Sequence, residues 1–372
     1  MCSLLINPWF NNQLYDIANI KITKFYTKEE LIVHFNELKE LFDEKKIFNS
    51  FNKAKKGKGL SEEIAIFKEE LSQNLDLILM TILNNSYIFG PYSSFIKYDN
   101  KKRYIVTSPF KDRLVHWILY DYLESIYEKT FIYDSFGNRK AKGTKAGALR
   151  AKDFIQKEQT KYILQIDLSK YFYSIHHDKL IKSLNQVTNP FVYKILINLI
   201  SSYETPDIFD DIFKKDSVYF ETHRKGMPIG ILSSQILANI FLNSTDHYIK
   251  EKLRVKYYIR YVDDMVFFLN SKEEANHLKK EIKSFLLNNL KIEINPKKIV
   301  IFPISEKKPL DFLGYRISKY KILPRKRTQK RIRNALLLDN KVALTSYKGI
   351  LKNTNSDLIR QVDFKCNIKN IN

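Results

Sequence analysis

The sequence of 372 residues is poor in cysteine and has no long apolar run. Its two cysteines, Cys2 and Cys366, lie at opposite ends and form no CxxC pair, so we expect neither a disulfide framework nor a zinc site. No stretch reaches the ~18 apolar residues of a membrane span. The first residues lack the basic region and apolar segment of a secretory signal, so a cytoplasmic location without membrane attachment is expected.

Acidic residues are also scarce relative to basic ones. The 41 Asp and Glu against 63 Lys and Arg leave a net charge of +22. Such a surplus favours binding to the phosphate backbone of nucleic acids. A genome rich in A and T explains part of the lysine excess, because Ile and Asn are plentiful too. It does not explain the arginine-bearing cluster PRKRTQKRIR at 324–333, so a nucleic acid is the expected partner.

A chain of 372 residues is too long for one small core, so two or three packed subdomains are expected, and a hydrophobic content of 44% is ample for a globular fold. Residues 1 to about 90 have a largely helical pattern, and Thr27 with Glu30 forms a capping-box sequence. The mixed order of helices and strands predicts an α+β fold. The first half of the chain is expected to continue with a helix over 61–85, a hairpin over 93–109, a helix over 112–129 and a basic loop over 134–147. A strand ending at Asp167, a helix over 178–202 and a long helix after a Gly/Pro turn at 226–230 are expected next. The last predicted elements are a hairpin over 257–268, an amphipathic helix over 271–290 and a strand pair over 291–302.

The stretch YYIRYVDDMVFF at 257–268 places two adjacent aspartates in an apolar, aromatic run. Neighbouring carboxylates repel each other and resist desolvation, so the arrangement is costly unless a cation neutralises it. If the strand that ends at Asp167 lies beside this hairpin, at ~4.8 Å, the carboxylates of Asp167, Asp263 and Asp264 converge. Such a cluster suits two Mg²⁺ ions that activate a hydroxyl and stabilise a leaving pyrophosphate. The alternative is an exposed Asp-Asp turn.

Seven motifs in order resemble the reverse transcriptase family, specifically its bacterial retroelement type, over roughly residues 95–320. The motifs are KKRYIVTSPFKDRLVHWIL, DSFGNRKAKGTKAGALRA, QIDLSKYFYSI, GMPIGILSSQILANIFLN, YYIRYVDDMVFF, LKIEINPKKIVI and DFLGYRI. The resemblance implies a right-hand polymerase fold with fingers, an antiparallel palm sheet with helices, and a short basic thumb. It assigns 1–94 to a helical extension and the start of the fingers, 95–315 to fingers and palm, and 316–372 to the thumb-like region.

The resemblance also implies roles for single residues. Asp167 and Asp263 would bind both metal ions and Asp264 would complete the carboxylate set, with two Mg²⁺ ions as cofactor and Mn²⁺ as the alternative. Phe172 would lie beneath the sugar, where its ring clashes with a 2′-hydroxyl and selects deoxynucleotides. Arg103 and Lys97 would clamp the incoming triphosphate. The alternatives are core packing for Phe172 and a solvated charged face for Lys97.

Further positions follow from the later motifs. Gly230 would allow close backbone approach to the nucleotide, and Gln235 would contact nucleotide or template. Lys298 would protonate the leaving pyrophosphate, although Lys297 beside it and a plain surface role are alternatives. The primer and template contacts fall on Tyr261, Leu313, Gly314 and Tyr315.

The implied function is an RNA-directed DNA polymerase that extends a primer with dNTPs on an RNA template, expected to be a dedicated noncoding RNA, and releases a DNA product. An accessory protein or a second copy of the chain is a further expected partner. No nuclease portion fits after residue 320, which disfavours retroviral and mobile group II intron enzymes. Ile231 stands where diversity-generating retroelement enzymes carry asparagine, which favours anti-phage defence over that role. A non-catalytic RNA-binding module is the competing class.

Overall fold

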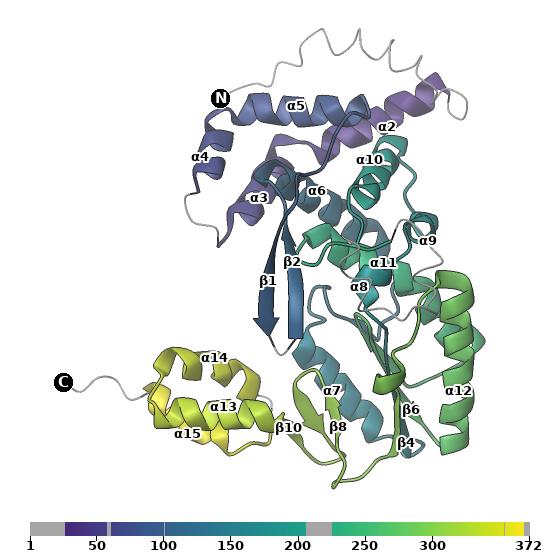
Figure 1. The fold of residues 1–372 in the computed structure, drawn as a ribbon, viewed down its shortest axis with the longest axis vertical. Helices are drawn as coiled ribbons and strands as arrows, with labels where there is room; N and C mark the ends of the chain where they lie inside the picture. The colour runs from purple at the N-terminus through teal and green to yellow at the C-terminus, as the bar shows by residue number, and fades with distance from the viewer. Residues whose placement is uncertain (1–26, 58–60, 100, 206–224, 353, 368–372) are drawn as a thin grey trace, which may run out of the picture. The chain divides into compact units, whose positions relative to one another are not determined.

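The structure is a computed structural model, and it describes residues 27–57, 61–99, 101–205, 225–352 and 354–367. The chain divides into two compact units, the first made of Met1–Thr130 and Phe172–Phe241, the second of Phe131–Tyr171 and Leu242–Asn372. Helices alternate with small, largely antiparallel sheets (Figure 1), so the predicted α+β class is confirmed. None of the described helices has the length and hydropathy needed to cross a membrane.

The first unit begins with helices, as predicted. They are α2 (Lys28–Leu41), α3 (Glu44–Lys55), α4 (Glu62–Glu69) and α5 (Leu71–Leu83). The capping box is confirmed, because Thr27 Oγ1 accepts from Glu30 N at 3.2 Å and Glu30 Oε2 accepts from Thr27 N at 2.7 Å. The one helix expected over 61–85 is two, since the backbone leaves helical geometry at Glu70. The helical prediction for residues 1–26 lies outside the described residues.

Helix α6 (Phe110–Tyr127) carries the core of the first unit. The fully buried Phe110 ring makes T-shaped contacts with Phe51 of α3 and Phe67 of α4, at centroid distances of 5.4 and 5.1 Å. Glu63 of α4 accepts hydrogen bonds from the backbone N–H of Phe110 and from Arg113 Nη2. This carboxylate therefore occupies the N-terminus of α6, where unpaired N–H groups favour negative charge.

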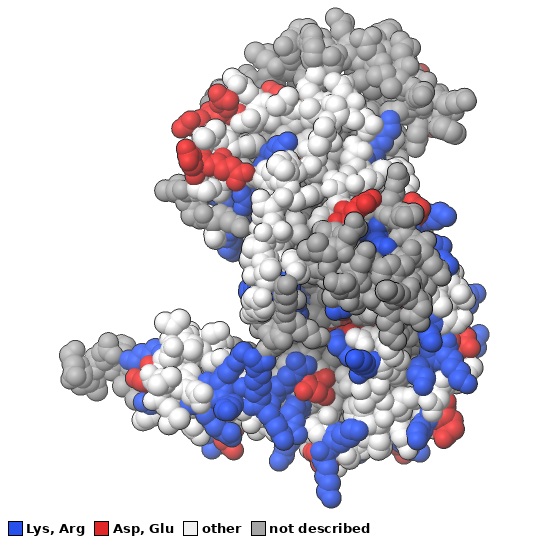
Figure 2. Space-filling model, viewed as in Figure 1, with Lys and Arg blue, Asp and Glu red and all other residues white. Residues whose placement is uncertain are grey.

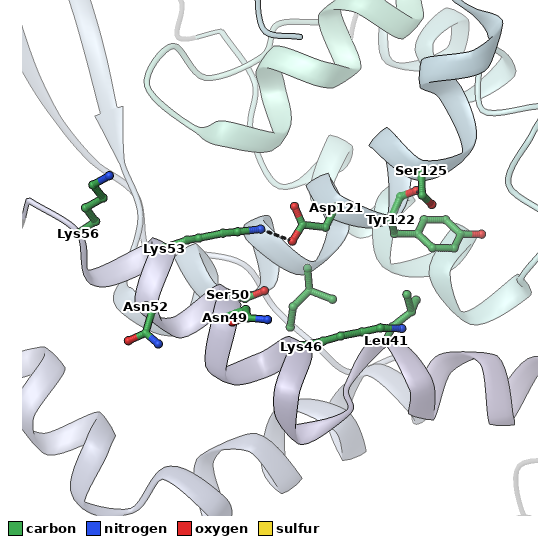
Figure 3. A pocket seen from close by; sticks show the side chains of 11 residues that line it. Leu41, Lys46, Asn49, Ser50, Asn52, Lys53, Lys56, Asp121, Tyr122 and Ser125 are labelled. Atoms are coloured by element: carbon green, nitrogen blue, oxygen red, sulfur yellow. Dashed lines mark hydrogen bonds and ion pairs between the residues drawn. The ribbon is translucent and has the colours of Figure 1, made fainter. Parts of the chain in front are cut away.

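A pocket of about 600 Å³ lies where α3 faces α6 (Figure 3). The ion pair between Lys53 Nζ and Asp121 Oδ2, at 2.6 Å, joins the two helices beside it. None of the lining residues is a predicted site residue. They are Leu41, Lys46, Asn49, Ser50, Asn52, Lys53, Lys56, Ile118, Asp121, Tyr122 and Ser125.

The remaining elements of the first unit include the predicted hairpin. Strands β1 (Ser93–Asp99) and β2 (Lys101–Thr107) pair antiparallel, which confirms it. The helix expected over 178–202 is two helices, α9 (His177–Lys182) and α10 (Pro190–Ser201), because the Asn189 side chain caps a new helix that starts at Pro190. Short α8 (Tyr171–Ser174) precedes them, and α11 (Leu232–His247) is the long helix expected after the Gly/Pro turn. The first unit includes α8 from Phe172 and α11 as far as Phe241, and the other residues of these two helices belong to the second unit.

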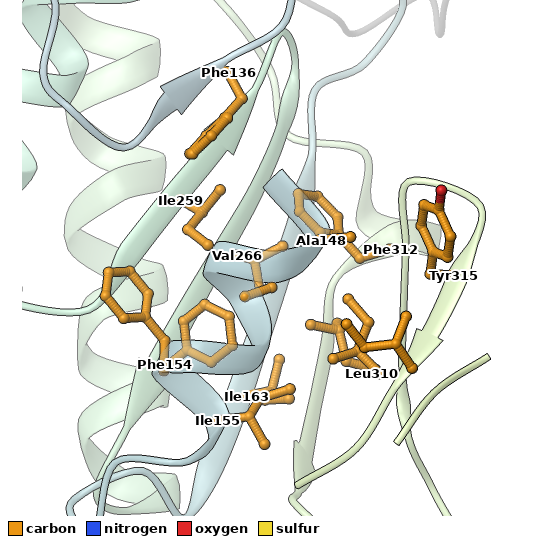
Figure 4. Close-up of a cluster of buried hydrophobic side chains, with 14 of the residues drawn as sticks. Phe136, Ala148, Phe154, Ile155, Ile163, Ile259, Val266, Leu310, Phe312 and Tyr315 are labelled. Carbon is orange, nitrogen blue, oxygen red and sulfur yellow. The ribbon is translucent and has the colours of Figure 1, made fainter. Parts of the chain in front are cut away.

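The second unit is built on a five-stranded sheet of order β3-β5-β6-β4-β7. Only the β3–β5 pair is parallel. The strands are β3 (Ser135–Phe136), β4 (Tyr162–Asp167), β5 (Tyr258–Tyr261), β6 (Asp264–Leu269) and β7 (Val300–Pro303). Helix α7 (Thr144–Ile155) buries Ala148, Phe154 and Ile155 against Ile163 and Val266 of the sheet (Figure 4). Helix α12 (Lys272–Phe285) also packs on this sheet and continues as the π-helix η4 (Leu286–Leu290).

Three further local predictions are wrong. The strand pair expected over 291–302 is the single strand β7, and the earlier half forms only one isolated bridge, Leu168 with Ile294, followed by the 3-10 helix η5 (Pro296–Lys298). The loop expected over 134–147 contains β3 and the first turn of α7. Asp264, expected in the hairpin turn, is already the first residue of β6.

The C-terminal part is ordered into a small sheet and three helices (Figure 1). Strands β8 (Leu310–Phe312), β9 (Tyr315–Ile317) and β10 (Ile322–Pro324) form the sheet. Helices α13 (Lys326–Leu337), α14 (Lys341–Leu351) and α15 (Leu358–Asn367) share a core of their own, made of Ile332, Ala335, Leu344, Leu351, Leu358 and Val362. The predicted domain boundaries at 94 and 315 stay predictions.

One buried histidine makes the stability of the first unit sensitive to pH. His116 of α6 has its Nδ1 2.9 Å from Ser233 Oγ of α11 and stacks on Phe89 at 5.4 Å. Its Nε2 is buried and has no hydrogen-bond partner among the described residues. Burial lowers the pKa of His116 to about 3.

We expect this histidine to weaken the fold as the pH falls. Because the unfolded ring takes up a proton near pH ~6.5 and the folded ring does not, stability is complete above that pH and is lost below it. Urea unfolding at pH 7.5 and 5.5 should show a loss about 1.4 kcal/mol larger in the natural chain than in His116→Asn. The control is His277→Asn, at an exposed position; equal losses in all three proteins would contradict the prediction.

Candidate active site

Asp167 and Asp264 meet at one end of the five-stranded sheet. Asp167 is the last residue of β4, Asp264 is the first of β6, and the two are direct partners in the antiparallel register. Val262 and Asp263 form the two-residue turn that joins β5 to β6, so Asp263 comes directly before Asp264. The prediction that these strand ends are neighbours is confirmed, although they are far apart in sequence.

The ionised carboxyl groups of this site repel one another. Burial, followed by the negative charges of Asp263 and Asp167, raises the pKa of Asp264 to about 7. Asp264 also shares a side-chain hydrogen bond with Asp167. A carboxyl group with this pKa is partly protonated at neutral pH, so the site has a demand for positive charge that the chain does not fully meet.

Lys298 supplies one positive charge. Its Nζ lies 2.5 Å from Asp167 Oδ1, and its side chain is 41% exposed. The 3-10 helix η5 that carries it is tied to the end of β4, because the N–H of Asn295 donates to the carbonyl of Asp167 at 2.9 Å. The Asn295 side chain in turn caps η5 by accepting from Lys297 N. Of the two adjacent lysines, the structure thus brings Lys298 to the carboxylates.

The donor set suits a hard divalent cation. Carboxylate oxygens are the ligands that Mg²⁺ prefers, and a cation would stabilise the ionised form of Asp264. In the described part of the chain, no group of three or more His, Cys, Asp or Glu side chains is arranged as a ready-made metal site. Asp167 and Asp264 therefore fit an ion as a hydrogen-bonded pair, and Asp263 lies near enough to affect the charge of Asp264.

The turn that presents Asp263 is strained. Val262 has a φ of 55°, in the left-handed region that β-branched residues rarely adopt. Its N–H donates to the carbonyl of Phe136 in β3 at 3.2 Å. A Cβ added to Gly137 would lie 2.8 Å from Val262 Cγ2, so glycine leaves the room that the valine needs. Strand β3 and Gly137 together hold the turn in place.

The predicted primer-contact residues also lie in the second unit. Leu313 and Gly314 form the turn between β8 and β9, with φ of 52° and 89°, and Tyr315 is buried in the core below (Figure 4). Leu313 Cδ1 lies 2.6 Å from the position that a Cβ on Gly147 of α7 would take. Tyr261 and Leu313 pack against the same core cluster. The structure thus brings three of these four residues to one cluster, with Gly314 in the turn beside them.

The predicted nucleotide-contact residues belong to the first unit. Lys97 and Arg103 are direct partners across β1 and β2 and are both exposed. Phe172 of α8 is half-buried, and its carbonyl accepts from Met227 N at 2.7 Å. The roles given to these side chains stay predictions.

Gly230 and Gln235 lie at the start of α11. Gly230 has a φ of 114°, and a Cβ there would lie 2.5 Å from the carbonyl oxygen of Val106, so a close approach to β2 already requires glycine. Gln235 is half-exposed on the helix. Their nucleotide and template contacts stay predictions as well.

Sequence reasoning missed Arg260 and Asp246, which form a fully buried ion pair, with Nη2 and Oδ2 2.6 Å apart. The signal was present in YYIRYV, where an arginine interrupts a strand that is otherwise apolar. A charge in a buried strand requires a partner. Nothing local, however, indicated that the partner is the aspartate near the end of the preceding helix.

We expect the charges around Asp264 to control its pKa. Asp263→Asn removes a like charge and should lower that pKa, whereas Lys298→Met removes a favourable charge and should raise it. Carboxyl ¹³C shifts followed through a pH titration measure both changes. Asp153→Asn, an exposed position on α7, is the control, and shifts in the same direction for both site variants would refute the charge arrangement.

The sequence is similar to a known protein family and to several known proteins. The model of the family described as reverse transcriptase (RNA-dependent DNA polymerase) matches residues 96–317, from β1 to β9. The putative COX1/OXI3 intron 2 protein of Saccharomyces cerevisiae is 24% identical over 340 residues, which cover 75% of this chain and 38% of that protein. The group II intron-encoded protein LtrA of Lactococcus lactis subsp. cremoris is 24% identical over 340 residues, 72% of this chain and 53% of that protein.

Protein YkfC of Escherichia coli is 23% identical over 256 residues, 59% of this chain and 64% of that protein. The chain spans less than two thirds of the length of each of these three relatives. The sequence alone disfavoured a group II intron protein, whereas an intron-encoded protein of that group is among the relatives.

Among solved structures, telomerase from Candida albicans in complex with the TWJ fragment of telomeric RNA has a TM-score of 0.48 at 11% identity and covers 74% of this chain and 54% of its own. Similarity this low carries no inference about activity. The family model matches well over half of the sequence and includes the strands that pair the carboxylates. It confirms the predicted right-hand polymerase fold, and the chain belongs to the reverse transcriptase (RNA-dependent DNA polymerase) family.

Proposed function

We propose that this chain is an RNA-directed DNA polymerase that extends a primer with deoxynucleotides on an RNA template. One observation carries the proposal: the pairing of β4 with β6 brings the carboxyl groups of Asp167 and Asp264 into a hydrogen bond, with Asp263 next to them. Membership of the family supports the reaction class. Carboxylates held together against their repulsion are the feature that phosphoryl transfer with metal ions needs.

Asp167, Asp263 and Asp264 would hold the divalent cations, which we propose to be two Mg²⁺ ions. When bound, such ions activate the attacking hydroxyl and stabilise the charge on the leaving pyrophosphate. The chain's own contribution is to fix the carboxylates at adjoining strand ends. Lys298, whose Nζ lies 2.5 Å from Asp167 Oδ1, would give a proton to the leaving pyrophosphate.

The first unit supplies the nucleotide contacts in this proposal. Arg103 and Lys97, exposed side by side on the β1–β2 hairpin, would bind the triphosphate, because a guanidinium binds phosphate oxygens bidentately. Phe172 would exclude the 2′-hydroxyl of ribonucleotides. Gly230 and Gln235 would contact the nucleotide and the template.

The second unit would hold the nucleic acid. Tyr261 and the turn at Leu313, Gly314 and Tyr315 would position the primer end. Helix α13 turns Ile332 and Ala335 inward, and Figure 2 shows Lys and Arg gathered on the C-terminal helices and the strands beside them. Backbone phosphates are the ligand that such a surface fits, independently of sequence. The exposed basic residues of α13 and its N-cap are Arg325, Lys326, Arg327, Lys330, Arg331 and Arg333.

For the biological role we propose anti-phage defence, with a dedicated noncoding RNA as template and an accessory protein or a second copy of the chain as partner. Ile231 in place of the asparagine of diversity-generating retroelement enzymes and the helices α2 to α5 before the family match support this choice. The neighbouring genes test it. A variable-protein gene with its repeat would favour the diversity-generating role instead.

Polymerase activity is tested with purified protein, Mg²⁺ and a primed RNA template. The natural chain should incorporate dNTPs, and Asp263→Asn should lower the rate by roughly 100-fold or more while RNA binding persists. Asp153→Asn, exposed on α7, should change the rate less than about twofold. If the natural chain incorporates neither dNTPs nor rNTPs and still binds RNA in a salt-sensitive way, the non-catalytic binding module replaces the polymerase.

The sugar contact is tested with Phe172→Ala. Removal of the ring should admit rNTPs and raise the ratio of rNTP to dNTP incorporation by about tenfold or more, because a steric barrier to the 2′-hydroxyl is lost. Competition between labelled rNTP and dNTP measures the ratio, and dNTP incorporation by the same variant is the internal control. An unchanged ratio would contradict the sugar contact and indicate that Phe172 serves only in packing.

A further inference from the structure

A fully buried ion pair lies directly behind the strained turn of the active site. Arg260 of β5 and Asp246 of α11 are both 0% exposed, and Arg260 Nη2 lies 2.6 Å from Asp246 Oδ2. The Arg260 Nε donates to the same carboxylate at 2.8 and 3.0 Å, and Tyr258 Oη donates to it at 2.9 Å. A buried ion pair is often replaceable by apolar residues without loss of stability, so stability alone does not explain it.

The guanidinium uses another nitrogen to hold the turn. Arg260 Nη1 donates to the carbonyl oxygen of Val262 at 2.9 Å, while Nη2 also donates to Ser135 Oγ at 2.9 Å. The N–H of the same valine is fixed by Phe136 of β3. Both peptide groups of Val262, the residue with φ of 55°, are therefore bonded to neighbours that are themselves buried.

The contacts of Arg260 thus run from Asp246 of α11 to the carbonyl of Val262, the residue before Asp263. Arg260, Asp246 and Ser135 are all buried, so this hydrogen-bonded network lies behind the turn and away from solvent.

We propose that Arg260 is a positioning residue of the polymerase site: held by Asp246, it fixes the carbonyl of Val262 and thereby the direction in which the turn presents Asp263 and Asp264. It is not a catalytic residue, because a side chain with no exposed surface meets neither nucleotide nor metal ion. This role rests on the proposed function only where it is measured as a rate of nucleotide addition. The effect of Arg260 on the positions of the Asp263 and Asp264 carboxylates does not depend on that function.

Arginine is suited to this task and lysine is not. The planar guanidinium presents donors in several fixed directions, so it binds the Asp246 carboxylate along one side and reaches Ser135 and Val262 with the others. A lysine ammonium has the same charge on a single nitrogen. It would keep the ion pair with Asp246 but could not also hold the turn from the same position.

Four variants separate positioning from simple stability. Arg260→Lys keeps the charge pair, and the double variant Arg260→Met with Asp246→Leu removes both charges without leaving either unpaired. Gly137→Ala disturbs Val262 from its other side. Ser135→Ala is the matched control, because it removes one hydrogen bond of Arg260 and leaves the Val262 contact intact.

Arg260→Lys, the double variant and Gly137→Ala should each lower kcat for dNTP addition by roughly tenfold to a hundredfold, with KM for the primed template within about twofold of the natural value. Ser135→Ala should keep both constants within about twofold. The thermal midpoint of the double variant should stay near that of the natural chain. If the double variant has both the natural midpoint and the natural kcat, the pair has no positioning role and the proposal is overturned.

Mn²⁺ binding, followed by electron paramagnetic resonance without nucleotide, gives a second readout. The three turn variants should bind Mn²⁺ several-fold more weakly than Ser135→Ala, because displaced carboxylates meet the ion less well. If the natural chain adds no nucleotide but the variants still weaken Mn²⁺ binding, the polymerase assignment fails and the positioning role stands. If rate and Mn²⁺ affinity are natural in Arg260→Lys and the double variant, the positioning role fails and the polymerase stands.

Discussion

The pairing of β4 with β6 is the constraint on which the rest of the second unit depends, because it forces like charges together. Asp167 and Asp264 are register partners, so both side chains leave the same face of the sheet from adjacent strands. Burial, followed by the negative charges of Asp263 and Asp167, raises the pKa of Asp264 to about 7, and the ammonium of Lys298 lies against Asp167. Such an arrangement is costly in an apolar sheet unless positive charge offsets it, which is why we propose that the site binds divalent cations.

The surrounding packing serves to keep that arrangement from relaxing. Val262 is held in a left-handed conformation by β3 on one side and by Arg260 on the other. Gly137 and Gly147 each lie where a Cβ would collide with a side chain of a neighbouring turn, at Val262 and Leu313 respectively. Helix α7 and the sheet bury a continuous apolar cluster beneath both turns (Figure 4). Rigid turns on a packed base are what a site with converging charges requires.

Two of the wrong local predictions share a physical cause. Residues 291–302 have apolar residues on both sides of Asn295 and Pro296, yet Pro296 lacks an N–H and Asn295 caps a 3-10 turn, so only β7 joins the sheet. The helix expected over 178–202 is interrupted because Asn189 followed by Pro190 starts a helix of its own. In each case a side chain that bonds its own backbone overrides the hydrophobic pattern.

Motif order and two adjacent aspartates in an apolar run are local features, so the sequence was enough to indicate the family and the α+β class and to predict Asp167, Asp263 and Asp264 as site residues. The folded structure was needed to show that Asp167 is the register partner of Asp264, that Lys298 forms an ion pair with Asp167, and that Arg260 pairs with Asp246. Those are contacts between segments distant along the chain. Which strand pairs with which, and which charge is desolvated beside which, depends on how the whole sheet packs, and no short stretch of residues contains that information.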